Sequence, residues 1–411
     1  MVFELLRSGI GYFVHLHRDM TFIQAVMARC VLYLLLHLLA LCQARNVLVF
    51  GGNGLLGAEV VSLLRLREAD ITIVNRGNWY WDTKYRIKPY VRHVKCDRYT
   101  IKSCKELDKV INEKGFFDIV YDFSSYVPSH LQNALEMLRS RVGRYVYVSS
   151  DSVYEVCKPS SHGGPSREED AIRYEDYAEL KQHPNFDFYG DSKLGCEEVL
   201  EQEHQDYRLT YITLRLPDVI GPRDNTDRFW IYFLWVKFQD VLDRPINFPP
   251  RLHDQQLSMV FSEDVASMML NLINVKNDSL NQAYNLACKE TVTLKEFLTM
   301  LGKHVGNINL IFDESTVNGA VYFPSVTRGS LNITKAEKLL SWTPRTLSEG
   351  IKKTAEFYNY AMKATEFRQQ RDGTVEVFVP HSKMEQFKKK FMEIYGKEFS
   401  LKFQLPIHNE L

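Results

Sequence analysis

The chain lacks an excess of charge of either sign, and it lacks metal-binding cysteine motifs. It has 51 Lys and Arg against 51 Asp and Glu, so its formal net charge is zero. A balanced composition gives no polyanion-binding surface and argues against nucleic acid as a partner. None of the seven cysteines stands in a CxxC or other metal-binding spacing, so no metal site is expected. Internal repeats and low-complexity runs are also absent, and 45% hydrophobic residues are ample for a sizeable globular core.

Five cysteines lie beyond Ala44: Cys96, Cys104, Cys157, Cys196 and Cys288. We expect them to be ordinary buried thiols. An oxidising compartment would allow some of them to pair, and the odd number would leave at least one of them unpaired within the chain.

A long apolar run occurs near the N-terminus, at Cys30–Cys42. A membrane-spanning helix needs about 20 apolar residues, so this run has the length of a signal peptide instead. Small residues at Cys42 and Ala44 suit signal-peptidase cleavage after Ala44. We therefore predict that residues 1–44 are a signal peptide, with either Met27 as the start or residues 1–26 as an unusually long segment before the apolar run. The alternative is an uncleaved signal anchor, and only then would the protein contact a membrane.

The last four residues, His408–Leu411, are a close variant of the His-Asp-Glu-Leu retention signal. With a signal-like N-terminus, this ending predicts the lumen of the endoplasmic reticulum. The extension at 364–411 reads as a strand at Thr374–Val379 and a helix opened by a capping box at Ser382–Glu385. Gly396 is expected to end that helix. The sequons at Asn277 and Asn332 permit glycosylation, although Asn332 also suits the start of the helix from Lys335.

The stretch Val47–Gly57 carries the most information in the chain. A short apolar run ends in Gly51, Gly54 and Gly57, and an amphipathic helical pattern follows. Glycines at this spacing allow a sharp turn, and they let a pyrophosphate approach bare N–H groups at the positive end of a helix. The pattern predicts a dinucleotide-binding strand, turn and helix.

Further strands alternate with helices along the first half of the chain. Strands are expected at 71–75, 91–96, 117–122 and 145–150, and helices at 105–113 and 131–140. This alternation predicts an α/β fold with a doubly wound parallel sheet, the Rossmann architecture. We assign 45–216 to the nucleotide-binding domain. From 217 to 363 the chain is expected to alternate between this sheet and a smaller substrate lobe.

A second motif, Tyr189-Gly-Asp-Ser-Lys193, starts a helical pattern, which places Tyr189 and Lys193 one turn apart on the same face. A nearby ammonium lowers the pKa of a phenol, whose reference value is about 10. Ser150 ends a buried strand upstream, and its hydroxyl can hold a substrate oxygen against the phenol. These three residues are therefore the predicted catalytic group, able to move a proton while a nicotinamide carries hydride.

Together these motifs resemble the extended short-chain dehydrogenases/reductases of the NAD-dependent epimerase/dehydratase superfamily. The resemblance runs from about Val47 to Tyr358 and includes the segments 214–222, 261–266 and 335–344. It implies a set of cofactor contacts besides Tyr189 and Lys193: Gly51, Gly54, Leu55, Leu56, Gly57, Asn75, Arg76, Asp97, Ser124, Pro217 and Val219. Asp97 and Ser124 have an equally plain interpretation as polar turn residues. A homodimer is compatible with the sequence.

The end of the second strand bears on the choice of cofactor. Members that bind NAD usually carry an acidic residue there, which holds the ribose hydroxyls. This chain has Asn75 and Arg76, which removes repulsion against a 2′-phosphate and offers a cation for it. We therefore expect NADP, and NAD remains an alternative.

The expected activity is that of an NADP-dependent oxidoreductase acting on a carbonyl or alcohol. The alternatives are a sugar-nucleotide epimerase or dehydratase that retains NAD, for which the substrate would be a nucleotide sugar, and a non-catalytic nucleotide- or RNA-binding relative. The dehydratase alternative is weakened because Asp151 is followed by Ser152, where the family's dehydratases carry a second acid. Arg228 falls in the substrate-facing segment, either as an anion clamp or in a salt bridge to Asp224 or Asp227.

Overall fold

The structure is a computed structural model that describes residues 45–182, 186–315, 319, 321–364, 367 and 371–399. The signal segment predicted at 1–44 and the terminal tetrapeptide lie outside these residues. The chain from Asn46 onward forms one compact unit. Over the described part of the chain, no helix has the length and apolar character needed to cross a bilayer.

A parallel sheet of seven strands organises the first part of this unit, in the order β10-β6-β5-β4-β1-β2-β3. The strands are β1 (Asn46–Phe50), β2 (Asp70–Asn75), β3 (Arg92–Lys95), β4 (Ile119–Asp122), β5 (Tyr145–Ser150), β6 (Tyr211–Leu216) and β10 (Gln282–Asn285). Every neighbouring pair in it runs parallel. The predicted doubly wound Rossmann sheet is confirmed, with strand ends shifted by one or two residues.

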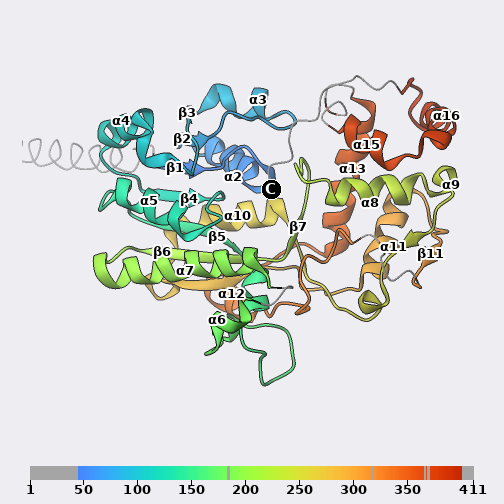
Figure 1. Cartoon of the computed structure of the whole chain (residues 1–411). Coiled ribbons are helices and arrows are strands. Elements are labelled where there is room, and N and C mark those ends of the chain that lie inside the picture. The colour runs from blue at the N-terminus through green and yellow to red at the C-terminus, as the bar shows by residue number, and fades with distance from the viewer. Residues whose placement is uncertain are drawn as a thin grey trace, which may run out of the picture. The chain divides into compact units, whose positions relative to one another are not determined.

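Helices cover both faces of the sheet (Figure 1). On one face, α2 (Leu55–Leu66) and α10 (Ser262–Asn271) pack over Val47 and Val49 of β1. On the other face, α4 (Lys105–Lys114), α5 (Pro128–Leu138) and α7 (Phe188–Tyr207) pack over Leu48 and Phe50. Successive residues of a strand point to opposite faces, so the continuous apolar run of β1 serves two cores at once.

A second lobe gathers around α8, α11 and α13, to the right of the sheet in Figure 1. Its elements are β7 (Asp218–Ile220), α8 (Arg228–Lys237), α9 (Gln239–Leu242), β8 (Ile246–Asn247), β9 (Met259–Phe261), α11 (Leu294–Val305), β11 (Phe312–Asp313) and α13 (Leu347–Lys363). Between these elements the chain returns to the sheet as α10, β10 and α12 (Thr334–Leu340). The lobe is thus interleaved with the Rossmann unit rather than appended to it.

Short helices connect these elements. They are α3 (Thr83–Arg86), α6 (Tyr177–Leu180) and the 3₁₀ turns η1 (Lys88–Tyr90), η2 (Ile101–Ser103), η3 (Asp151–Val156), η4 (Glu168–Asp170), η5 (Pro250–Leu252), η6 (Leu272–Asn274), η7 (Asn277–Ser279) and η8 (His381–Lys383).

The strand predicted at Thr374–Val379 is wrong, because this segment forms α15 (Asp372–Phe378). An alternating strand would place Val375, Val377 and Val379 on one face. Instead Val375, Phe378 and Val379 are buried while Val377 is 88% exposed, which is the spacing of a helix face. The Phe378 ring meets Trp235 of α8 at 5.7 Å between centroids, so packing overrides the local β-branched pattern.

The last helix, α16 (Met384–Tyr395), was predicted correctly, and Gly396 ends it with φ at +63°. The predicted capping box is wrong, since a 3₁₀ turn over His381–Lys383 precedes the helix and no side chain caps it. Phe387 of α16 packs against Phe238 at 4.6 Å. The extension is therefore part of the core of the second lobe.

The structure corrects the expectation for two of the cysteines. Cys96 and Cys104 form a disulfide, with their Cα atoms 6.1 Å apart. The segment after β3 folds back through η2, which brings two cysteines eight positions apart within bonding range. The other three, Cys157, Cys196 and Cys288, are free buried thiols, as expected.

Candidate functional site

The carboxyl ends of the parallel strands collect most of the predicted site residues. Gly51 follows β1, Asn75 ends β2, Ser124 follows β4 and Ser150 ends β5. Parallel strands end at one edge of a sheet, and ligands of doubly wound sheets bind outside that edge. The structure thus brings together residues up to 99 positions apart.

The glycine turn after β1 is shaped for close backbone approach. Gly51 has φ at +85°, and a Cβ on Gly57 would lie 2.4 Å from the Gly51 carbonyl oxygen. Gly54 is the N-cap of α2 and offers no side chain to the helix, whose first turn includes Leu55 and Leu56 and holds no acidic residue. The first N–H groups of α2 therefore suit an anion such as a pyrophosphate.

Sequence reasoning missed Asn225, which reaches this turn from the second lobe. Its Oδ1 accepts a hydrogen bond from the Leu55 N–H at 3.4 Å. The same oxygen lies 3.4 Å from the position that a Cβ on Gly54 would occupy. Asn225 therefore borders the anion site, although it was not among the site residues predicted from the sequence.

Asn75 is fixed at the end of β2 with one polar atom unused. Its Oδ1 accepts from the Gly77 N–H at 2.7 Å and contacts the His93 ring at 2.9 Å. Its buried Nδ2 has no hydrogen-bond partner among the described residues. Arg76 is exposed beside it. An unsatisfied amide donor and an exposed cation thus stand where the ribose of a dinucleotide is expected.

The remaining predicted cofactor contacts differ in how they are held. Asp97 is half-buried, and its carboxylate caps the Tyr99 N–H at 2.9 Å, the local turn contact considered above. Ser124 has a buried hydroxyl without a hydrogen-bond partner in the described part of the chain, close to the Gly51 turn. Pro217 is buried and Val219 is half-buried in β7. A dinucleotide would therefore meet one free hydroxyl at Ser124.

Lys193 is held firmly on α7. Its side chain is buried, and its ammonium donates to the carbonyl of Val148 at 2.7 Å and of Ser125 at 3.0 Å. Burial lowers the pKa of Lys193 to about 8. Two of its three N–H donors are thus fixed by backbone, and the third has no acceptor among the residues that the structure describes.

Tyr189 lies one turn before Lys193 on α7, as predicted. The Lys193 nitrogen is 6.0 Å from the centre of the Tyr189 ring, which is 45% exposed. Burial of the hydroxyl raises the pKa of Tyr189, while a hydrogen bond with Ser150 acts to lower it. The three predicted catalytic residues are therefore brought together.

A buried pair of carboxyl groups adjoins Ser150. The Ser150 hydroxyl donates to Asp151 at 3.2 Å. Burial first, and then the neighbouring Asp218, raise the pKa of Asp151 well above its usual range. Arg228 pairs with Asp218, which also accepts from the Ser325 hydroxyl at 2.8 Å. Arg228 thus forms a salt bridge, but its partner is neither of the two carboxylates proposed from sequence.

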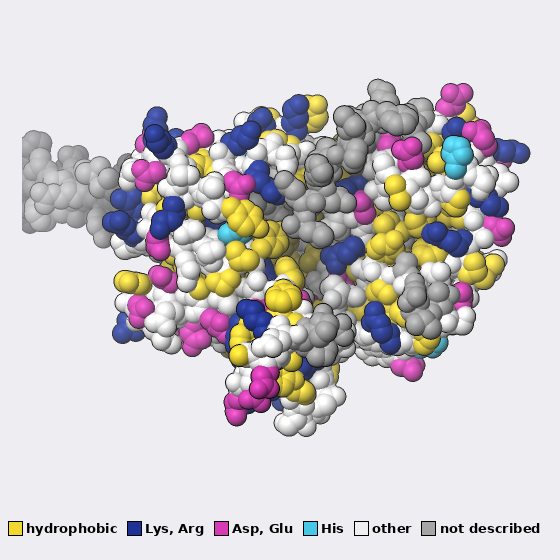
Figure 2. Space-filling model, viewed as in Figure 1, with side chains coloured by type: hydrophobic (Ala, Val, Ile, Leu, Met, Phe, Trp, Pro, Cys, Tyr) yellow, Lys and Arg dark blue, Asp and Glu magenta, His cyan; other side chains and the backbone are white. Residues whose placement is uncertain are grey.

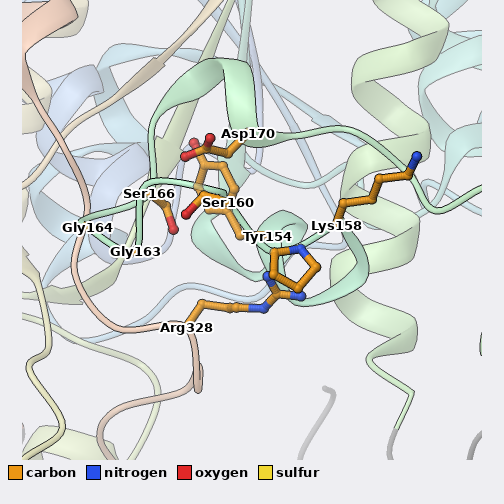
Figure 3. Close-up of a pocket in the computed structure, with 9 residues that line it drawn as sticks. Tyr154, Lys158, Ser160, Gly163, Gly164, Ser166, Asp170 and Arg328 are labelled. Carbon is orange, nitrogen blue, oxygen red and sulfur yellow. The ribbon is translucent and has the colours of Figure 1, made fainter.

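A polar pocket of about 230 Å³ is lined by Tyr154 of η3 and by residues of the segment that follows (Figure 3). Tyr154, Ser166 and Asp170 cluster at its wall, Arg328 enters from a distant segment, and Lys158 points away. The Tyr154 hydroxyl is already bonded to Asn285 at 2.7 Å. The residues that line this pocket include none of the Ser150–Tyr189–Lys193 group, so it is not where that group acts.

Comparison with known proteins supports this description. The model of the NAD dependent epimerase/dehydratase family matches residues 47–287. No curated protein sequence matches the chain.

Among solved structures, a UDP-glucose 4-epimerase from Thermotoga maritima matches at 18% identity and a TM-score of 0.59, covering 77% of this chain and 99% of its own. A dTDP-glucose 4,6-dehydratase from Bacillus anthracis, solved with NAD, matches at 18% identity and 0.60, covering 77% and 97%. A UDP-glucuronic acid 4-epimerase from Bacillus cereus, solved with UDP-glucuronic acid and NAD, matches at 18% identity and a TM-score of 0.58, covering 77% of this chain and 99% of its own. At these identities the likeness establishes the fold.

Proposed function

The chain belongs to the NAD-dependent epimerase/dehydratase family, and from this premise we propose that it is an NADP-dependent oxidoreductase that interconverts a carbonyl and an alcohol. The observation that carries the proposal is the Ser150–Tyr189–Lys193 group. Its lysine is fixed by two backbone carbonyls, and its phenol lies one helical turn from that lysine, close enough to Ser150 for the serine to act on the pKa of the phenol.

Each residue of this group has a defined task. Ser150 holds the substrate oxygen against the Tyr189 hydroxyl, which donates a proton to it in reduction and accepts one in oxidation. The Lys193 ammonium stabilises the phenolate that remains after donation, and its third N–H is available to a ribose hydroxyl. When bound, the nicotinamide would supply or accept the hydride.

The nucleotide-binding edge supports a dinucleotide with a 2′-phosphate. Gly57 packs closely against the Gly51 carbonyl, and the start of α2 has no side-chain cap, which suits a pyrophosphate. The Ser124 hydroxyl, which has no partner among the described residues, suits a ribose. At the end of β2, Asn75 presents an unused N–H donor, and Arg76 lies exposed next to it. Donors and a cation favour a phosphate, whereas a carboxylate would favour ribose hydroxyls.

Two arginines of the substrate-facing segment support a carbonyl compound over a sugar nucleotide. Arg223 binds Asp82 in bidentate fashion at 2.7 and 2.9 Å. Arg228 pairs with the buried Asp218. Binding a diphosphate through either arginine would leave a carboxylate without its cation, which is costly when the carboxylate is buried.

The proposal includes a compartment, the lumen of the endoplasmic reticulum. The Cys96–Cys104 disulfide supports it, since such bonds persist in oxidising compartments. For the non-catalytic RNA-binding alternative, a continuous basic surface would be needed. On the face shown in Figure 2, cationic and anionic side chains are interspersed.

The test uses the purified full chain with NADPH, NADH and a panel of aldehydes and ketones. We expect NADPH to bind more tightly than NADH and to be consumed in the presence of a suitable carbonyl. Tyr189→Phe should reduce turnover about 10²–10⁴-fold while nucleotide affinity stays unchanged. A chain that keeps stoichiometric NAD through purification and consumes no NADPH would instead be an epimerase.

A further inference from the structure

We propose that Arg98 is a positioning residue for Lys193, acting through Asp122 and Ser125, and that it thereby sets the affinity for the nicotinamide half of the dinucleotide. This inference rests on the proposed function. It concerns a buried ion pair that no sequence motif indicated.

We call the chain of contacts from Arg98 through Asp122 and Ser125 to Lys193 the Arg98 link, and Asp122, at the end of β4, is its centre. Its side chain has no exposed surface, and its Oδ2 accepts from Arg98 at 2.7 Å and from the Tyr145 hydroxyl at 2.6 Å. Its Oδ1 accepts from the backbone N–H groups of Ser124 and Ser125, each at 2.9 Å. Burial alone would raise the pKa of Asp122, but the Arg98 charge and these donors hold it below its usual value.

Ser125 carries the link from Asp122 to the catalytic lysine. Its hydroxyl donates to Asp122 at 2.6 Å, and the Arg98 guanidinium also contacts that hydroxyl. The Ser125 carbonyl accepts from the Lys193 ammonium at 3.0 Å and from the Tyr147 hydroxyl at 3.1 Å. The residue whose carbonyl holds Lys193 is thus fixed by Asp122 at its own N–H and at its side chain.

Arg98 supplies the cation in this cluster. A buried carboxylate that loses its cation tends to take up a proton, and it can then no longer accept from all of its donors. Asp122 would release Ser125 or Tyr145, and the carbonyl that holds Lys193 would shift.

Two features hold Arg98 itself in place. Its guanidinium stacks 4.3 Å above the Phe50 ring at the end of β1. The Cys96–Cys104 disulfide closes the segment on which it stands. The Nε and Nη1 of Arg98 are buried without a hydrogen-bond partner among the described residues, whereas its Nη2 donates to Asp122 and contacts Ser125. We therefore expect its effect on a ligand to pass through these two residues.

The experiment compares two probes, NADPH and 2′,5′-ADP, which lacks the nicotinamide half. Binding is measured for the wild type, Arg98→Met, Lys193→Met and the double variant. We expect Arg98→Met to lower the affinity for NADPH about tenfold, which is the scale of one hydrogen bond to a charged group. The affinity for 2′,5′-ADP should not change. In the Lys193→Met background, Arg98→Met should have no further effect, because the residues act as one unit.

An equal loss of affinity for both probes in Arg98→Met would show that Arg98 acts only on the adenine side of the site. Additive losses of NADPH affinity in the double variant would show that Arg98 does not act through Lys193. Either result overturns the inference. Arg144→Met is the matched control, since Arg144 binds the carbonyls of Leu272 and Val275 at the opposite edge of the sheet. It should leave both affinities unchanged.

Arg98→Gln, which also removes the cation, replaces Arg98→Met if the latter does not fold, and it is read in the same way: a loss of affinity confined to NADPH sustains the inference, and any other pattern overturns it. If the wild-type protein prefers NADH, the same comparison is made with NADH in place of NADPH and AMP in place of 2′,5′-ADP. A wild type that binds neither dinucleotide contradicts the proposed function itself.

Discussion

Asn75→Asp gives the sharpest test of cofactor choice, because it adds a negative charge and almost no change of shape. The new carboxylate keeps the oxygen that accepts from the Gly77 N–H and contacts His93. Its second oxygen replaces an Nδ2 that has no partner among the described residues. The variant should therefore fold normally, and its effect should fall on the ligand.

The expected magnitude follows from Coulomb's law. A 2′-phosphate about 5 Å from the new carboxylate is repelled by about 3 kcal/mol at an effective dielectric of 20. Asn75 is half-buried, so solvent screening reduces this to about 2 kcal/mol, or about 30-fold in affinity. A ribose 2′-hydroxyl would instead donate to the carboxylate, so the affinity for NADH should rise.

Fluorescence titration of both nucleotides measures the ratio of the two affinities. Asn75→Asp should move that ratio toward NADH by at least 30-fold. Arg76→Ala should lower the affinity for NADPH more than the affinity for NADH. Asn78→Asp, an exposed change three positions away, is the matched control for added charge. A wild type that already prefers NADH, or an unchanged ratio in Asn75→Asp, would refute the assignment of this strand end.

Three further predictions concern stability and compartment. Peptide mapping without reductant should find Cys96 linked to Cys104, and Cys96→Ser should lower the free energy of unfolding by about 2.5 kcal/mol in denaturant titration. When the full chain is expressed in a secretory pathway, endoglycosidase should change its mobility. This mobility change should be lost in Asn277→Gln, because Asn277 is exposed and can carry a glycan. It should be kept in Asn332→Gln, because the Asn332 side chain is half-buried and accepts a hydrogen bond from the Thr334 N–H at 3.0 Å. Phe387→Ala should cost about 3–5 kcal/mol by the same titration, since this ring of α16 is fully buried in the second lobe; a loss under 1 kcal/mol would show that the extension is not part of that core.

Local patterns predicted the Rossmann half well. The β1 run, the glycine turn and the α2 pattern each depend on residues close in sequence, and the structure has them where they were expected. Tyr189 and Lys193 are likewise one helical turn apart because four positions separate them on α7. Periodicity is enough when partners are neighbours along the chain.

The same reasoning failed where distant packing decides the outcome. Thr374–Val379 has strand-forming residues, yet it is mostly helical because three of its apolar side chains are buried in the core cluster that also contains α8, and Phe378 contacts Trp235 of that helix. Arg228 was expected to pair with a carboxylate close by in its own segment, and it pairs with Asp218 across the start of the lobe. Such partners are set by tertiary geometry, which a single sequence does not contain.

The Arg98 link shows why the most informative part of the site was hidden from the sequence. Arg98 and Asp122, which are in contact, are 24 positions apart in the sequence, and Ser125 and Lys193 are 68 positions apart. Arg98 follows the edge strand β3, and Asp122 ends β4 on the far side of β1 and β2. The arginine thus crosses the end of β1 to reach the nicotinamide side of the site. Because the strand ends proposed to bind the two halves of a dinucleotide share these buried contacts, a change beside β3 is expected to alter the position of Lys193.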